Sequence, residues 1–436
     1  MDQYFLWEKG QKRYFQLPAT WRVLNNFALE TGKVEKTVSD MVEESLAHPI
    51  GTSPLKEIIK PPDKVVIILD DFARPTPKKE ILTCLIHHLE KLGVSHSQID
   101  VLFGLGTHRP LSKSEVEEIL GNKFMGEIRY SNHDCRSDRL ISIGRLKTGG
   151  EVKINPLLIE ADFRIGIGSI LPHPFCGFGG GPKIIMPGVA NYEAIREHHI
   201  AYLIAPGSSF GNLQNNHFFE EICEVARKAK LNFIINTVYN SKEEVKAIVS
   251  GHFERAHRFG VDLSLKEFAV KVDKSADVSI ASAFPYDEGP QVLKPLGPAT
   301  MVTKQGGTVI LTASVRGGKL PDILFQSFDT AFELAKGDPK RLVLDFLRDG
   351  KLILPNAPMD FNCALDITLL YLSRVQVVMV SKDIDEDQAR RLGFRHANSL
   401  VDAIQKVSKE VPRGDVNILP AGGLITPLIK EEMRFQ

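Results

Sequence analysis

The residues best suited to chemistry gather between Ser169 and Ala190, where the chain reads SILPHPFCGFGGGPKIIMPGVA. A histidine, His173, precedes a run of glycines, and a lysine, Lys183, follows it. The glycines are Gly177, Gly179, Gly180 and Gly181. Glycines bunched in this way let backbone N–H groups close on an anion, usually a phosphate, because no side chain stands in between. The stretch therefore predicts an anion-binding loop with a lysine beside it.

The glycine run alone does not identify a ligand. The phosphate loop of common NTPases needs Gly directly before its lysine and Ser or Thr directly after it, whereas Pro182 precedes Lys183 and Ile184 follows it. An ordinary NTPase is therefore disfavoured. A tight turn with a solvated lysine fits the same letters, so the choice depends on the rest of the chain.

Three predicted strands in the N-terminal half end in reactive side chains. They cover residues 65–71, 99–106 and 162–170, and they lead to Asp71 and Arg74, to His108, and to His173 and Lys183. In open α/β sheets, ligands bind at the carboxyl ends of parallel strands. A single histidine after a strand is more often a cap or a core residue, but three strands that end in this way favour a site at one edge of a sheet.

A helix is predicted after the glycine loop. The segment NYEAIREHHIAY begins at Asn191, a residue suited to cap a helix, and contains the adjacent His198 and His199. Neighbours on a helix point about 100° apart, so only one of the two can face the site. His199 shares the apolar side of the helix with Tyr192 and Ile195, and the periodicity therefore favours His199.

The elements that would position these residues are those of an α/β protein. The strand VVIILDD leads through a polar turn into an amphipathic helix over 77–93, which is the first half of a βαβ unit. From about Leu265 the pattern restarts, with strands at 276–283, 306–314 and 375–381 alternating with helices.

We therefore predict two α/β domains with mostly parallel sheets and an active-site cleft between them, because 436 residues exceed what one core holds. The N-terminal domain is expected at 1–265, with the glycine loop and the histidines, and the C-terminal domain, which closes the cleft, at 275–410. A last strand within 414–436 is expected to return to the first domain.

Composition narrows the class of protein. The chain has 54 basic and 54 acidic residues, so no bulk charge points to nucleic acid or a membrane surface. No apolar run reaches the roughly 18 residues that span a bilayer, and the opening MDQYFLWEKG resembles no signal peptide, so a cytoplasmic location is expected. Five scattered cysteines without a CxxC pair argue against a disulfide framework or a cysteine zinc site.

Taken together, the motifs resemble those of the nickel-pincer lactate racemase family of 2-hydroxyacid racemases and epimerases. The resemblance rests on an ordered series, DDFARPTP, GLGTHRP, PHPFCGFGGGPKIIMPG, NYEAIREHH and PQVLK, that runs from Asp70 to Lys294. The spacing from His173 through Lys183 to His199 also resembles the family pattern, which favours His199 over His198. The resemblance implies two α/β domains, with the last strand returning to the first.

The resemblance also implies a cofactor, a nickel ion in a pincer formed by pyridinium-3,5-dithiocarboxylic acid mononucleotide. This nucleotide is made by separate cofactor-biosynthesis enzymes, which would be partners of the chain. By resemblance, Lys183 carries the cofactor covalently through a thioamide bond, His199 is the protein's nickel ligand, and His108 and His173 are the catalytic acid and base. Further cofactor contacts are implied for Asp71, Phe72, Ala73, Arg74, Gly179, Gly180, Gly181, Gln291 and Lys294, and substrate contacts for Arg74, Gln291, Lys294 and Phe361.

Physical chemistry agrees with these implied roles. Racemisation at C2 requires a base on each side of the substrate, and two histidines with ordinary pKa values near 6.5 can both accept and donate protons at neutral pH. Hydride transfer needs an electrophilic carbon that side chains lack, hence a cofactor. Arg74 and Lys294 offer cations for the substrate carboxylate, and the imidazole of His199 suits nickel.

The differences from the family pattern concern residues of the expected substrate pocket. Pro172, Pro290 and Phe361 differ from the lactate racemase pattern, so lactate, a larger aliphatic or aromatic hydroxyacid, malate and a sugar acid all remain candidate substrates.

A zinc-dependent hydrolase would use His108, His173 and His199 as ligands but would leave Lys183 without a role. A non-enzymatic phosphometabolite-binding protein would use the glycine loop alone and give no reason for His108.

Overall fold

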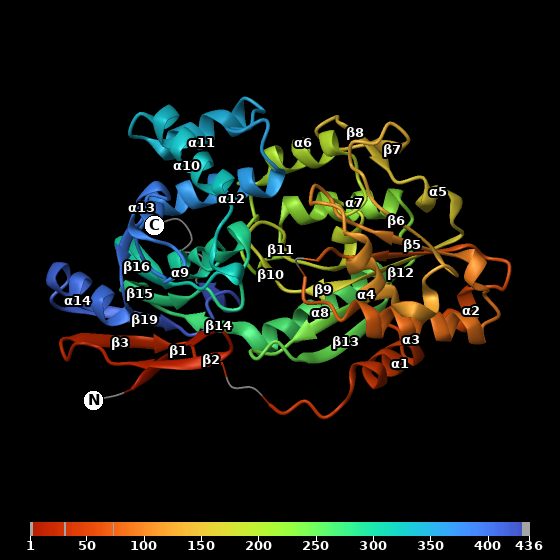
Figure 1. The fold of residues 1–436 in the computed structure, drawn as a ribbon, viewed down its shortest axis with the longest axis horizontal. Helices are drawn as coiled ribbons and strands as arrows, with labels where there is room; N and C mark the ends of the chain where they lie inside the picture. The colour runs from red at the N-terminus through yellow and green to blue at the C-terminus, as the bar shows by residue number, and fades with distance from the viewer. Residues whose placement is uncertain (1–2, 30–31, 73, 430–436) are drawn as a thin grey trace. The chain divides into compact units, whose positions relative to one another are not determined.

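The computed structural model describes residues 3–29, 32–72 and 74–429 (Figure 1). The chain forms two compact units. Unit 2 is the continuous stretch 32–267, and unit 1 combines residues 1–31 with 268–436. Among the described residues, no helix is long and apolar enough to cross a lipid bilayer.

Unit 2 is built on a six-stranded sheet with the order β13-β12-β9-β4-β5-β6. Its strands are β4 (Val65–Leu69), β5 (Ile99–Phe103), β6 (Arg129–Asn132), β9 (Phe163–Ile170), β12 (Phe233–Tyr239) and β13 (Val245–Gly251). All neighbouring pairs are parallel except β12 with β13. The carboxyl ends of β12, β9, β4 and β5 therefore lie along one edge of the sheet, as the pattern of strand ends predicts.

Helices cover both faces of the unit 2 sheet. Alternate residues of β4 pack with the apolar stripes of α1, α3 and α4, where Ile81, Leu85 and Leu89 of α3 are fully buried. On the other face, Val261 of α8 packs with Ile170. The helices are α1 (Val38–Ala47), α2 (Leu55–Ile58), α3 (Lys78–Lys91), α4 (Lys113–Phe124), α5 (Leu157–Glu160), α6 (Tyr192–Tyr202), α7 (His217–Lys228) and α8 (Phe253–Phe268), with the hairpins β7 (Ile141–Arg145)–β8 (Glu151–Ile154) and β10 (Pro172–His173)–β11 (Gly177–Phe178) and the short η1 (His96–Gln98) and η2 (Gly181–Ile184).

Unit 1 has a second six-stranded sheet, in the order β18-β17-β16-β15-β19-β3, and all of its neighbouring pairs are parallel. Its strands are β3 (Trp21–Asn26), β15 (Ala276–Ser282), β16 (Thr303–Thr312), β17 (Gln376–Val380), β18 (Arg395–Ala397) and β19 (Gly414–Leu419). The other elements are β1 (Tyr4–Glu8), β2 (Gln11–Phe15), β14 (Ala269–Val272), β20 (Thr426–Ile429), α9 (Leu296–Met301), α10 (Asp322–Ala335), α11 (Pro339–Arg348), α12 (Met359–Leu372), α13 (Glu386–Arg391), α14 (Leu400–Glu410), η3 (Gly289–Leu293) and η4 (Arg316–Gly318).

The predicted fold class, α/β with two mainly parallel sheets, is confirmed, but both ends of the chain differ from the expected division. Residues 1–31 belong to unit 1, where β3 pairs with β19. The last strands also stay in unit 1, because β19 pairs with β15 and β20 with β14. The prediction that 414–436 returns to the N-terminal domain is therefore wrong for its described residues. Parallel pairing joins segments far apart in the chain, and hydrophobic patterns do not record which segments pair.

Candidate active site

The predicted reactive residues of unit 2 lie at the carboxyl edge of its sheet. Asp71 follows β4, His108 follows β5, and His173 lies just after β9 in the short strand β10. Since β4 is the strand between β5 and β9, the strands that lead to the two histidines are separated by two strand spacings, on the order of 10 Å. The parallel order therefore brings both histidines to one edge.

His108 is held by a carboxylate. Its Nδ1 lies 2.7 Å from Oδ2 of Asp71, whose side chain is buried. A carboxylate accepts hydrogen bonds, so the ring proton of neutral His108 sits on Nδ1 and donates to Asp71. This arrangement leaves the lone pair on Nε2, which makes His108 a base in its neutral form.

His173 has the opposite arrangement. Its Nδ1 accepts from the backbone N–H groups of Phe175 and Cys176, each at 3.3 Å. The ring proton of neutral His173 must then sit on Nε2, which makes Nε2 a hydrogen-bond donor in the neutral form. The tight hairpin between β10 and β11, in which His173 pairs with Gly177, supplies this geometry.

The glycine loop differs from the expected anion cradle. The N–H of Gly179 donates to the carbonyl oxygen of Leu171 at 2.7 Å, and that of Gly181 donates to Oδ1 of Asn236 at 2.7 Å. These two amides are therefore used inside the protein, which corrects the idea that the loop offers them to a phosphate.

Packing explains why glycines stand in this loop. A Cβ on Gly181, where φ is +55°, would lie 2.5 Å from the ring of His257. A Cβ on Gly180, where φ is +74°, would lie 2.9 Å from the backbone oxygen of Ser169 and from Oδ1 of Asn236. Side chains are excluded at both positions, so the loop can press its backbone against the sheet.

Lys183 lies at the end of this loop, in η2. Its positive charge lowers the pKa values of nearby buried groups. Burial raises the pKa of the Cys176 thiol to about 11 against the opposing effect of Lys183, so Cys176 stays protonated. Burial is also the main cause that lowers the pKa of His199 to about 4, and Lys183 adds to that shift. Lys183 and His199 are therefore electrostatic neighbours.

The environment of His199 suits a metal ligand. Its Nδ1 donates to the carbonyl oxygen of Ile195 at 2.8 Å, one turn earlier on α6, which leaves the lone pair on Nε2. The low pKa keeps the ring neutral, the form that binds a metal. His198 is enclosed instead, with Nε2 bonded to the carbonyl oxygen of Phe218 at 3.0 Å and the side chain fully buried. Asn191 is at the N-cap position of α6, but its Oδ1 accepts from the N–H of Lys153 rather than capping the helix.

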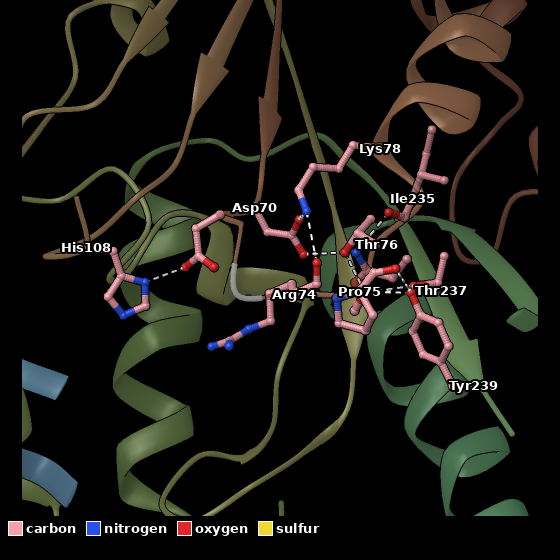
Figure 2. A network of polar contacts seen from close by, with 12 residues as sticks. Asp70, Arg74, Pro75, Thr76, Lys78, His108, Ile235, Thr237 and Tyr239 are labelled. Carbon is pink, nitrogen blue, oxygen red and sulfur yellow. Dashed lines mark hydrogen bonds and ion pairs between the residues drawn. The ribbon is translucent and has the colours of Figure 1, made fainter. Parts of the chain in front are cut away.

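The segment that follows β4 carries Arg74 and is bound to the sheet behind it (Figure 2). Nζ of Lys78 donates to the carbonyl oxygen of Arg74 at 3.1 Å and pairs with Oδ1 of Asp70 at 3.2 Å. The hydroxyl of Thr76 donates to Oδ2 of Asp70 at 2.6 Å. In Figure 2 the Arg74 side chain extends toward the side on which His108 lies. Phe72 is half-buried with its ring 6.2 Å from that of His108, and Ala73 lies outside the described residues.

Three predicted site residues belong to unit 1. Nζ of Lys294 donates to Oε1 of Gln291 at 2.8 Å and lies 4.7 Å from the ring centre of Tyr286. Gln291 is on η3, and Phe361 is half-buried on the adjacent helix α12. Among the described residues, no three His, Cys, Asp or Glu side chains are grouped as a metal site, so the three-histidine zinc site of the alternative hydrolase is not formed there.

Comparison with known proteins shows that the chain is similar to lactate racemases. The lactate racemase N-terminal domain family matches residues 10–211. Lactate racemase from Thermoanaerobacterium thermosaccharolyticum is 28% identical over 407 residues, 92% of each chain, and that from Lactiplantibacillus plantarum is 29% identical over 389 residues, 88% of this chain and 89% of the relative. The structure of the lactate racemase apoprotein from T. thermosaccharolyticum is similar over 99% of this chain and 100% of that one, with a TM-score of 0.86 and 25% identity.

Residues 10–211 match the lactate racemase N-terminal domain family, and the chain is similar to lactate racemases over most of its length. A protein from Thermotoga maritima shares the fold alone, with a TM-score of 0.60 at 20% identity over 90% of this chain and 98% of that one. The family match includes every predicted site residue of unit 2 and ends before the three of unit 1.

Sequence reasoning did not foresee several contacts of this site. It named Asp71 as a cofactor contact but did not predict its hydrogen bond with His108. It gave no role to Lys78 or Asn236, which hold the segments on either side. Polar letters inside the otherwise apolar strand LNFIINTVY were the available signal for Asn236.

Proposed function

We propose that the chain is a racemase or epimerase that interconverts the C2 stereoisomers of a 2-hydroxy acid with a nickel-pincer nucleotide cofactor. The observation that carries this proposal is the complementary pair of histidines, because His108 presents a lone pair and His173 a proton, from neighbouring parts of one sheet edge. Similarity to relatives that are named lactate racemases supports the same reaction class.

The two histidines divide the proton transfers. For one enantiomer, Nε2 of His108 takes the hydroxyl proton, and Asp71 stabilises the imidazolium that forms. Nε2 of His173 would return a proton to the oxygen on the other side from the imidazolium form of that ring, which would be left neutral with its remaining proton on Nδ1. For the opposite enantiomer the roles reverse. Backbone amides approach Nδ1 of His173, whereas a carboxylate approaches Nδ1 of His108, so the two directions start from unequal acid and base strengths.

The residues of unit 2 fit the proposed cofactor. Lys183 would hold the nucleotide covalently, and Nε2 of His199 would coordinate the nickel ion, as its orientation by Ile195 and its neutral ring favour. When bound, the cofactor would accept and return the C2 hydrogen as hydride, chemistry that no side chain supplies. Cofactor-biosynthesis enzymes would be the partners that load it.

The substrate carboxylate needs cations. Arg74 would bind it, and Lys294 and Gln291 are proposed as further substrate contacts. Phe361, together with Pro172 and Pro290, would shape the pocket around the substrate side chain. Candidate substrates are therefore screened from lactate to larger aliphatic and aromatic hydroxyacids, malate and sugar acids.

A C2-deuterated substrate tests the reaction. The chain is produced together with the cofactor-making enzymes, and racemisation is followed in ordinary water by NMR and chiral chromatography. Retention of deuterium at C2 with a primary isotope effect is expected, because carbon-bound hydrogen carried as hydride does not exchange with water. Loss of deuterium in step with turnover would show that a histidine removes C2 hydrogen as a proton, and would refute the proposed mechanism.

A further inference from the structure

Two segments of the site are fastened to the same strand end. Asn236, Thr237 and Tyr239 occupy the carboxyl end of β12, and all three side chains are buried. We call these three residues the β12 anchor. Successive side chains of a strand point to opposite faces of the sheet, so Asn236 points away from Thr237 and Tyr239.

Asn236 holds the glycine loop. Its Oδ1 accepts the N–H of Gly181 at 2.7 Å, two residues before Lys183, while its Nδ2 donates to the carbonyl oxygen of Ile235 at 2.9 Å. Both functional groups of the amide are therefore satisfied, which fixes its orientation. The absence of a Cβ on Gly180 permits this contact, since a Cβ there would lie 2.9 Å from Oδ1.

Thr237 and Tyr239 hold the Arg74 segment (Figure 2). The hydroxyl of Tyr239 donates to the carbonyl oxygen of Pro75 at 2.9 Å and accepts from Thr237 at 3.0 Å. Ser169 of β9 joins the same hydroxyl network, at 2.9 Å from Thr237 and 2.5 Å from Thr76. Burial raises the pKa of Tyr239, so its hydroxyl remains a donor at all ordinary pH values.

We propose that the β12 anchor positions two functional side chains through separate contacts. Asn236 positions Lys183 for cofactor loading, and Thr237 and Tyr239 position Arg74 for substrate binding. The functional roles of Lys183 and Arg74 rest on the proposed function, whereas the two fastenings rest on the contacts alone. Because the fastenings lie on opposite faces of one strand, the two functions should be separable by mutation.

The test uses the full chain with Asn236→Ala and Tyr239→Phe, and with Ser250→Ala as the matched control. Ser250 is also buried in the same sheet and donates to the carbonyl oxygen of Ser45 at 2.7 Å, so its replacement removes a comparable hydrogen bond on β13. Intact mass measures the fraction loaded after co-production with the cofactor-making enzymes. Loading forms a bond between the lysine nitrogen and the thiocarboxylic acid carbon, and the displaced oxygen leaves as water.

Asn236→Ala should slow loading by about tenfold or more, because a displaced lysine loses its attack geometry, while the loaded fraction keeps its KM. Tyr239→Phe should leave loading unchanged and raise KM for the hydroxyacid by about 3–10-fold, the worth of one hydrogen bond. Ser250→Ala should change neither. If Asn236→Ala does not fold, Asn236→Ser, which keeps a short polar side chain, should show a smaller loading defect. Equal effects of Asn236→Ala and Tyr239→Phe on both measurements would overturn the proposal.

Hydrogen exchange of the apoprotein tests the contacts of the β12 anchor independently of loading and racemisation. Asn236→Ala should speed exchange in the peptide around Gly181 alone, and Tyr239→Phe in the peptide around Pro75 alone. This result would support the two fastenings even if the wild-type chain neither loads nor racemises, in which case the proposed function fails and the anchor stands. Unchanged exchange in both peptides would overturn the anchor, whatever the activity.

Discussion

The two units share one architecture but differ in their buried histidines, which gather in unit 2. Unit 2 buries His198, His199 and His257 beside its glycine loop, and each of them bonds to a backbone carbonyl, which favours the neutral ring. Among the described residues, unit 1 buries the carboxyl of Asp366 on α12, whose Oδ1 has no hydrogen-bond partner. The difference indicates that a parallel sheet edge becomes a candidate site where oriented polar groups support it, and that parallel topology alone is not sufficient.

The largest expected effect tests whether covalent chemistry is confined to unit 2. Lys183→Ala should abolish the covalent nucleotide adduct when the chain is produced with the cofactor-making enzymes, as intact mass would show. The control Lys153→Ala changes a partly exposed lysine of the same unit that pairs with Glu151 at 3.2 Å, and it should load normally. An adduct on the Lys183→Ala chain, for example on Lys294 of unit 1, would break the comparison.

The next effect concerns orientation by Asp71. Asp71→Asn should lower kcat by about 10²–10⁴-fold in both directions, because His108 loses the carboxylate that fixes its tautomer and stabilises its charged form. Steady-state kinetics with each enantiomer would measure it. The control Asp100→Asn removes a carboxylate that pairs with Arg129 at the exposed start of the same sheet, and it should leave kcat unchanged. A normal kcat for Asp71→Asn would show that His108 does not need this orientation.

Asp366 gives unit 1 its own pH response. Burial raises its pKa to about 7, above the ordinary value of 3.8, so the folded state binds an extra proton between these values. Stability is therefore fully present below about pH 4 and is lost as pH rises through 7. Asp366→Asn should stabilise unit 1 at pH 8 by up to about 4 kcal/mol, and by less at pH 5.

Urea unfolding measured by tryptophan fluorescence reports on this unit, because both tryptophans, Trp7 and Trp21, belong to it. The control is Asp345→Asn on α11, where the carboxyl is only partly buried, and it should show no comparable gain at pH 8. An equal gain from Asp366→Asn at both pH values would contradict an ionised buried carboxyl.

The smallest expected effect is a loss of stability of unit 2 as pH falls. Its dependence on pH is opposite in sign to that of Asp366 in unit 1. Burial lowers the pKa values of His199 and His257 to about 4, so the unfolded chain binds more protons than the folded one between about pH 6.5 and 4. Stability is therefore present above about 6.5 and lost as pH falls toward 4, by up to about 3 kcal/mol for each histidine.

Hydrogen exchange of unit 2 core peptides as a function of pH, corrected for the intrinsic exchange rate, would measure this loss. His257→Gln should reduce the slope of the unfolding free energy against pH by the equivalent of up to one bound proton. The control His217→Gln, at an exposed position on α7, should leave this slope unchanged. If acid left unit 2 unaffected while unit 1 lost stability, the comparison between the units would be reversed.

Local signals in the sequence determined much of this protein. The run VVIILDD, the stripe through Ile81, Leu85 and Leu89, and the restart of the pattern after 265 record hydrophobic burial along the chain, so they predict the α/β class and most strands of both sheets. The ordered motifs from Asp70 to Lys294 likewise indicated the family, because they combine residue types and spacing.

The tertiary structure alone decided the rest. The pairing of β3 with β19 depends on partners almost 400 residues apart, which no local pattern records. The tautomers of His108 and His173 depend on what approaches Nδ1, a carboxylate in one case and two amides in the other. The amides of the glycine loop are taken up by Leu171 and Asn236 because folding brings those acceptors within hydrogen-bond distance, and composition cannot reveal such distances.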